Sequence, residues 1–232
     1  MNLPAQNKDL IGVASLAMGV VVFSLQDAII KSISGDYPVT MAIVVRCLVA
    51  LPLLLLMVQI EVGLSRLLSR NAGVLILRGI ILLVAYTTYF MSLAALPLAE
   101  AIALFFTAPL IITLLSGPLL GERVSLQAWV AVIVGFIGVL IILRPGSALF
   151  EPAALLSLVS ATTYALSMVI ARRIGVTEAA TVMAFYQNGV YLLGASLAAI
   201  AFAMVGIEEL GHPSLDFLVR PWSTPRSLDL ML

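Results

Sequence analysis

The sequence predicts an all-α, polytopic membrane protein with seven transmembrane helices, and three observations lead to this fold class. Of the 232 residues, 62% are hydrophobic and only 10% are charged, whereas an ordinary soluble domain carries about 25% charged residues. The apolar residues gather in runs of about 20, the length at which a helix crosses the hydrocarbon core of a bilayer. Two such runs, within residues 97–146, are joined only by Gly121-Glu122-Arg123.

Each long apolar run is predicted to be a helix because lipid offers no hydrogen-bond partner to an unpaired backbone. The predicted helices are 10–33, 38–60, 72–96, 98–120, 124–143, 152–171 and 179–205. A short turn at 34–37 joins the first two, and Pro97 separates the third from the fourth. The loop at 144–147 contains proline and glycine, which break helices, and Pro152 suits the first turn of the next helix.

Composition and motifs exclude several kinds of site. The formal net charge is zero, so the chain offers no electrostatic footprint to nucleic acid. Cys47 is the single cysteine and His212 the single histidine, which excludes an intramolecular disulfide and any cysteine- or histidine-rich metal site. The sequence contains no GxxxxGK[ST] phosphate loop and neither HExxH nor HxxxxD. We therefore expect no catalytic residue, no cofactor and no metal.

The helices are predicted to form a complete five-helix unit and two helices of an inverted second unit. The predicted units are 10–143 and 152–205, followed by an extramembrane tail at 206–232. Shifting the chain by 141 residues lays Ile33 on Ile174 and Arg46 on Gln187, a match mainly of hydropathy. A unit with an odd number of helices is upside down when duplicated, which is common among secondary transporters.

Charges in the predicted loops favour a cytoplasmic N-terminus. The basic residues on the cytoplasmic side would be Lys8, Arg66, Arg70, Arg123, Arg172 and Arg173. Lys31 and Arg144 would lie on the outer side, as would Arg220 and Arg226 in the tail. The N-terminus lacks the basic cluster and cleavage site of a signal peptide. We expect a multi-pass protein of the inner or plasma membrane.

Two segments resemble the EamA-like family of the drug/metabolite transporter superfamily. Residues 97–146 contain PLAEA at the start of the fourth helix, TAP at 107–109, the GER turn and the ending GFIGVLIILRPG, and residues 24–46 resemble that family's first hairpin. Members have ten helices in two inverted five-helix units, with both ends cytoplasmic. The resemblance implies a small-molecule permease rather than an enzyme, and a chain that is truncated after two helices of its second unit.

The leading hypothesis is a secondary transporter that moves a small organic metabolite by alternating access. An amino-acid-like, vitamin-like or drug-like solute would each fit. One alternative is a truncated membrane remnant that does not transport, or a half-unit that needs a partner; an intramembrane enzyme is the other. The expected partners are the lipid bilayer and a small-molecule substrate, with a homodimer as a further candidate.

Charged residues inside membrane helices usually face the interior of the bundle or a watery cavity. Asp27 and Arg46 lie at similar depth in the first two predicted helices, so we expect them to form an ion pair. The pair would either fix the hairpin or line a cavity for a polar solute. Arg78, about two turns into the third helix, would either reach the headgroups with its long stem or meet a substrate carboxylate.

Aromatic and amide side chains at membrane depth are the expected substrate contacts, because small-molecule sites combine apolar walls with a few convergent polar groups. The candidates are Tyr86, Tyr89, Tyr164, Tyr186, Gln187 and Asn188. Tyr191 is expected to be only an interfacial anchor. Pro109 is expected to kink the fourth helix, and Gly135 and Gly138 to let the fifth approach a neighbour closely.

Overall fold

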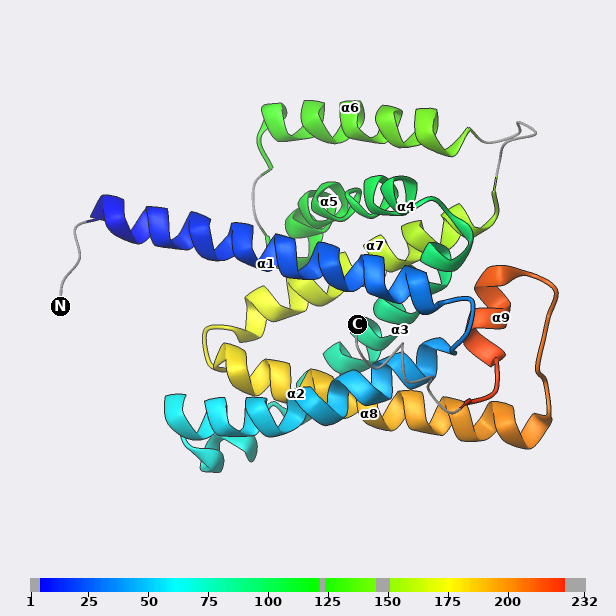
Figure 1. Ribbon diagram of the computed structural model, residues 1–232. Coiled ribbons are helices and arrows are strands. Elements are labelled where there is room, and N and C mark those ends of the chain that lie inside the picture. The colour runs from blue at the N-terminus through cyan, green and yellow to red at the C-terminus, as the bar shows by residue number, and fades with distance from the viewer. Residues whose placement is uncertain (1–4, 122–123, 145–150, 224–232) are drawn as a thin grey trace.

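The computed structural model describes residues 5–121, 124–144 and 151–223, and the regular structure in these residues is all helical. The helices are α1 (Ala5–Ile33), α2 (Val39–Glu61), η1 (Leu64–Leu67), α3 (Ala72–Ala95), α4 (Leu98–Phe105), α5 (Ala108–Leu120), α6 (Leu126–Leu143), α7 (Ala153–Ile174), α8 (Ala180–Val205) and α9 (Pro213–Val219) (Figure 1). By length and composition, seven segments of this described part can cross a membrane, with α4 and α5 counted together. The predicted fold class is confirmed. The predicted turn at Glu122 and Arg123 and the loop residues 145–147 lie outside the described residues.

The fourth predicted helix is interrupted near its middle. α4 ends at Phe105 and α5 begins at Ala108, and in the break Thr107 Oγ1 donates to the Leu104 carbonyl at 2.8 Å. Pro109 lies in the first turn of α5, where its missing N–H leaves no helical hydrogen bond unmade. The predicted kink is therefore confirmed, with the proline placed just after the break.

α3 is the central helix of the bundle. Its most extensive contacts are with α7 and α8, and it also contacts α1, α4 and α9. Small residues permit these close approaches, as is usual between helices in lipid. Ser160 Oγ of α7 donates to the Ala85 carbonyl at 2.6 Å, and a Cβ at Gly79 would lie 2.8 Å from Cγ2 of Val190 on α8. The inward face of α3 therefore determines what the bundle encloses.

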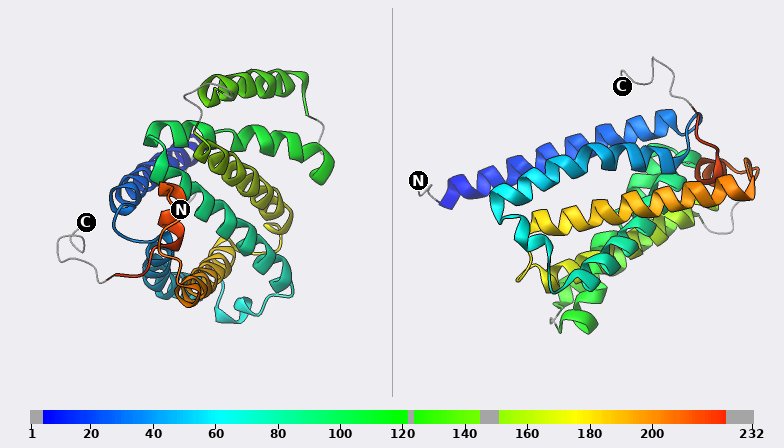
Figure 2. Two further views of the ribbon diagram at one scale, coloured as in Figure 1. Left: turned by 90° about the vertical axis from the view of Figure 1, so that its right-hand side faces the viewer. Right: turned by 90° about the horizontal axis from the view of Figure 1, so that it is seen from below.

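α6 lies at the edge of the bundle, against α5 and α4 (Figure 2, left). A Cβ at Gly135 would clash with Leu110 of α5, so the expected close packing is confirmed there. Nothing lies within 4 Å of a Cβ at Gly138, so the same expectation is wrong for that residue.

The first two helices do not pack along one another as the sequence suggested. α1 has its main contacts with α3 and α4, while α2 packs against α8. Lys31 anchors α1 by donating from Nζ to the carbonyls of Leu93 and Leu96, at 2.7 Å each, at the end of α3. These carbonyls have no partner within their own helix, so the lysine caps the helix as it attaches α1.

The α1–α2 and α7–α8 hairpins have matching geometry. α1 ends at Ile33 and α7 at Ile174, while α2 begins at Val39 and α8 at Ala180; each pair is 141 residues apart (174 − 33 and 180 − 39). The turns match as well. The N–H of Asp36 donates to the Ile33 carbonyl, and the N–H of Thr177 donates to the Ile174 carbonyl. The two turns therefore have the same backbone form.

The matching hairpins meet where α2 crosses α8. Cys47 and Asn188, themselves 141 residues apart, are in contact there, with 3.7 Å between Sγ and Oδ1. Two positions related by an internal repeat can touch each other only at an axis relating the copies. The observed contact therefore lies where such an axis would pass.

The two ends of the bundle differ in character (Figure 2, right). At one end the α2–α3 and α7–α8 loops are joined by Glu178, whose Oε1 accepts from Ser69 Oγ at 2.6 Å and Asn71 Nδ2 at 2.8 Å. At the other end the tail expected at 206–232 folds back within its described part: Phe217 of α9 is fully buried, and Arg220 Nη1 donates to the Ser34 carbonyl at 2.9 Å.

Candidate functional site

A row of six aromatic rings runs through the middle of the bundle. The row consists of Tyr191 (α8), Tyr86, Phe90 and Tyr89 (α3), Phe105 (α4) and Tyr164 (α7). Neighbouring ring centroids are 4.2 to 5.5 Å apart, in edge-on or tilted contacts, which are the favourable arrangements for aromatic pairs. Tyr89 and Phe90 follow Tyr86 by three and four residues on α3, so helical geometry places both of them next to Tyr86. We call this set the aromatic row.

Arg46 of α2 rests on one end of the aromatic row. Its Nη1 donates to Tyr86 Oη at 2.6 Å, and its guanidinium carbon lies 4.2 Å from the Tyr86 ring centroid and 5.4 Å from that of Tyr191. Contact with ring faces offsets part of the cost of removing the cation from water. Nε of Arg46 is buried and has no hydrogen-bond partner. The guanidinium is thus positioned by aromatic groups and retains donor capacity for a ligand.

Tyr191 is central to this end of the row. It is 1% exposed, its hydroxyl donates to the Leu82 carbonyl at 3.1 Å, and Gln187 Nε2 donates to that hydroxyl at 3.3 Å. The expectation of an interfacial anchor is therefore wrong. A signal was present in the sequence, because Gln187 and Tyr191 are four residues apart and must share a helix face.

Asp27 of α1 contacts α3 about one helical turn beyond Tyr86, the residue that Arg46 contacts. Tyr89 donates its hydroxyl proton to Asp27 Oδ2 at 2.8 Å, and both side chains are partly buried. Within the described residues no ion pair joins Asp27 to Arg46, so the expected direct pair is wrong. The physical reason is that α1 does not pack on α2, and each charge instead bonds a separate tyrosine of α3.

Of the two remaining predicted tyrosines, Tyr164 belongs to the aromatic row and Tyr186 does not. Tyr164 forms the far end of the aromatic row, 5.3 Å from Phe105. Tyr186 does not join the row, because its hydroxyl donates to the Leu67 carbonyl at 2.6 Å beside the α2–α3 loop. It belongs to a second apolar cluster, built on Val58, Leu75 and Val182. Tyr186 therefore helps to close one end of the bundle.

Arg78 points into the bundle. It is only 7% exposed, and its Nε is buried without a hydrogen-bond partner. The expectation that its stem reaches the headgroups is therefore wrong. No property of the sequence fixes which way a single arginine faces, since the rotation of α3 about its axis depends on its neighbours.

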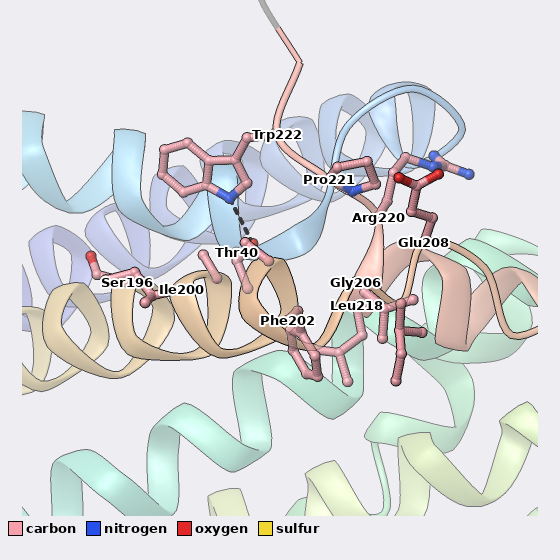
Figure 3. A pocket seen from close by; sticks show the side chains of 14 residues that line it. Thr40, Ser196, Ile200, Phe202, Gly206, Glu208, Leu218, Arg220, Pro221 and Trp222 are labelled. Atoms are coloured by element: carbon pink, nitrogen blue, oxygen red, sulfur yellow. Dashed lines mark hydrogen bonds between the residues drawn. The ribbon is translucent and has the colours of Figure 1, made fainter.

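A groove of about 500 Å³ separates α1 from α2 and reaches Arg46. Its walls are mostly apolar side chains on one face of α1, including Val22 and Ile33, together with Tyr37 of the α1–α2 turn and the first two turns of α2, and Gln26 is a further polar group. A second cavity of about 560 Å³ lies between α8, α9 and the start of α2, where Trp222 Nε1 donates to Thr40 Oγ1 at 3.1 Å (Figure 3). The groove, rather than this second cavity, leads to the charged end of the aromatic row.

The fold and this interior define a multi-pass membrane protein whose helices hold charged and phenolic groups suited to binding a polar solute. The chain belongs to the EamA-like transporter family, whose sequence profile matches residues 10–144, more than half of its length. The resemblance found in the sequence is thereby confirmed.

Individual relatives carry transporter names. The chain is 31% identical over 157 residues to an S-adenosylmethionine uptake transporter of Rickettsia prowazekii, a match covering 68% of this chain and 47% of the relative. It is 29% identical over 191 residues to a pseudopaline exporter of Pseudomonas aeruginosa (82% and 65%). It is 44% identical over 80 residues to a riboflavin transporter of Rhizobium johnstonii (34% and 26%). The matches to the Rickettsia relatives span about half of those proteins. No solved structure matches.

Proposed function

We propose that this chain takes part in secondary transport of a small organic metabolite by alternating access. The observation that carries the proposal is the pair of membrane-embedded charges, Arg46 and Asp27, held on Tyr86 and Tyr89 inside the bundle, with a groove leading to Arg46. Charges at this depth are costly, and those that occur usually mark a binding site or a pathway. Membership of a transporter family supports the same conclusion.

We assign the solute contacts to the aromatic row and its polar partners. The proposed contacts are Asp27, Arg46, Tyr86, Tyr89, Tyr164 and Gln187, with Tyr191 added from the structure. Tyr186 is left out because its hydroxyl is bonded to the loop carbonyl of Leu67. A solute with charged parts and a flat apolar part would fit this site. Its charged parts would contact the guanidinium of Arg46 and the carboxyl group of Asp27, and its flat part would lie on the aromatic rings.

A movement of α1 relative to α2 is the proposed route of access. The groove already separates these helices, and α1 is fixed to the bundle mainly at its end, through Lys31. As α1 moves, the hydrogen bond between Asp27 and Tyr89 would break. Each of these side chains would then form a polar contact with the solute instead. Both the closed and the open arrangement then leave few buried polar groups unpaired.

We further propose an inner or plasma membrane location with a cytoplasmic N-terminus. Three basic residues are exposed at one end of the bundle: Arg66 and Arg70 between α2 and α3, and Arg173 in the last turn of α7. Hydrogen bonds through Glu178 join the α2–α3 and α7–α8 loops at that end. The gathering of positive charge at one end supports cytoplasmic placement of that end.

The division into an inverted repeat, with units 10–143 and 152–205, stays part of the proposal. The matching ends of the α1–α2 and α7–α8 hairpins support it, as does the Cys47–Asn188 contact at a separation of 141 residues.

The test is solute uptake into proteoliposomes containing the full chain. The solutes are S-adenosylmethionine, riboflavin and a panel of labelled amino acids, with Tyr86→Phe compared against Tyr186→Phe. Loss of the hydrogen bond between Arg46 and Tyr86 should raise the KM of a transported solute by about tenfold to a hundredfold, since such a bond to a charged group contributes about 1.5–3 kcal/mol. Tyr186→Phe, which lies outside the row, should leave the KM unchanged.

Absence of uptake for the whole panel would contradict transport by this chain and favour a membrane protein that does not transport. Equal effects of the two tyrosine variants would contradict the assignment of the row as the solute site.

A further inference from the structure

Arg78 is a buried cation without a protein counter-charge. It lies on the inward face of α3, between Leu75 and Leu82, which belong to two separate apolar clusters. Within the described part of the chain no hydrogen bond or ion pair holds the side chain, and its Nε is fully buried. Tyr164 of α7 and Tyr191 of α8 are near enough to act on it electrostatically.

An unpaired guanidinium in this position is expensive. Removing an ion from water without compensating contacts is among the largest costs in a folded protein. Interior arginines are therefore normally paired with an acid or used by a ligand. Nε of Arg78 is fully buried, whereas the terminal nitrogen atoms retain accessible surface. The free donors are thus at the fork of the guanidinium, the part that binds planar oxyanions.

The balance of charges around the aromatic row also favours an anionic ligand near Arg78. Arg46 and Arg78 both act electrostatically on Tyr191, one from α2 and one from α3. Asp27 is the carboxyl group that reaches the row, and it is bonded to Tyr89. Two guanidinium groups therefore face one carboxyl group, and the described residues supply no second acid to balance them.

We propose that Arg78 binds a carboxylate of the transported solute. The proposal rests on the proposed function and adds a substrate class to it, because the solute must carry at least one carboxylate. The fork of Arg78 would accept the carboxylate in a bidentate manner, while the flat or cationic remainder lies on the aromatic row toward Arg46 and Asp27. Arginine suits this role better than lysine because its donors are fixed in a plane.

The test measures ligand-induced stabilisation of the purified full chain in detergent. Cys47 is the only cysteine and is fully buried, so a fluorogenic maleimide reports unfolding without any added label. The probes are two matched pairs at constant ionic strength, each a carboxylate and its neutral amide: acetate with acetamide, and benzoate with benzamide. At ten times the dissociation constant, the acid of a pair should raise the unfolding midpoint by about 2–4 °C more than its neutral counterpart.

The variant Arg78→Gln should lose this difference between acid and neutral probe, and Arg78→Lys should keep only part of it. The matched control is Arg66→Gln, an exposed arginine in η1, which should behave as wild type. A difference that persists in Arg78→Gln would overturn the proposal. So would equal shifts, or no shifts, with the acid and neutral probes on the wild-type chain.

A second measurement separates ligand binding from a structural role. Without any carboxylate present, Arg78→Gln should unfold at the same temperature as wild type or higher, because it removes an unpaired buried charge. A clear decrease would mean that Arg78 stabilises the bundle itself, and the proposal would fail. Uptake that does not depend on Arg78 would remove this inference alone, whereas carboxylate binding without uptake would remove the proposed function alone.

Discussion

The two charges beside the aromatic row, Asp27 and Arg46, are each hydrogen-bonded to a phenol of α3. Asp27 accepts from Tyr89, and Arg46 donates to Tyr86, so α3 separates two groups that opposite charge alone would bring together. A phenol can donate to a carboxyl group and accept from a guanidinium, so it bonds either charge without neutralising it. The two charges are therefore held in place and keep their charge, as the proposed solute site requires.

The Asp27–Tyr89 bond gives a prediction at the scale of single residues. Tyr89→Phe should lower the free energy of unfolding by about 1–3 kcal/mol, because it leaves a carboxyl oxygen without its donor. In the background of Asp27→Asn the same change should have a smaller effect, since the carboxyl group is no longer present. Thermal unfolding followed through Cys47 measures both values.

Asp27→Asn also tests the functional role of the carboxyl group. Uptake should fall while the amount of protein inserted in the membrane is unchanged. Full uptake by this variant would contradict a role of Asp27 in transport and leave it with the purely structural role of holding α1 on α3.

Sequence reasoning named six of the proposed contacts, because polar groups at membrane depth are rare and therefore conspicuous: Asp27, Arg46, Tyr86, Tyr89, Tyr164 and Gln187. It did not distinguish Tyr186, which lies beside the α2–α3 loop, from Tyr191, which is buried in the aromatic row. The two are five residues apart on α8, which turns them to different faces and puts them at different depths. Only the packing of α8 against α2 and α3 decides which of these faces is central.

At the scale of elements, small residues determine how close the helices come. A Cβ at Gly79 would lie 2.9 Å from Cβ of Val190, an atom close to the backbone of α8 that has little freedom to move. The break between α4 and α5 likewise lets Phe105 reach the aromatic row from α4, while α5 continues along α7. Neither feature involves a charged residue, yet both position the site.

Two glycine variants test this packing. Gly79→Ala should destabilise the protein by about 1–3 kcal/mol, because the added methyl group forces α3 away from α8. Gly138→Ala is the matched control, since nothing lies within 4 Å of a Cβ there; alanine should stabilise that helix by about 0.5–1 kcal/mol. The measurement is again the unfolding midpoint reported by Cys47. Equal changes in the two variants would contradict the close α3–α8 contact.

At the scale of the whole molecule, the loops divide between two ends. The α2–α3 and α7–α8 loops share one end, where Glu178 bonds Ser69 and Asn71. The α1–α2 turn and α9 share the other, where Arg220 bonds the Ser34 carbonyl. The alternating direction of the helices places these loops at opposite ends of the bundle (Figure 2).

Labelling of single cysteines tests this arrangement. In a background of Cys47→Ser, the cysteine variants Leu68→Cys and Val176→Cys lie at sites that are 90% and 89% exposed, and Gly35→Cys lies in the exposed turn at the other end. A membrane-impermeant maleimide added to intact cells should label Gly35→Cys and should label the other two only after lysis. Labelling of Leu68→Cys and Val176→Cys in intact cells would reverse the orientation, and labelling of only one of them would contradict the shared end.

The sequence alone determined the fold class and the seven membrane-spanning segments, but it did not show that the fourth is broken between α4 and α5. Bilayer thickness imposes a length on each apolar run, and the breaks between runs carry their own turn chemistry. It also suggested a shift of 141 residues, which is the separation between the ends of α1 and α7. Only the tertiary structure decided that α3 lies between Asp27 and Arg46, that Tyr191 is central and that Arg78 faces inward. The physical reason is that lipid constrains the length of a helix and leaves its rotation and its choice of neighbours to the packing of side chains.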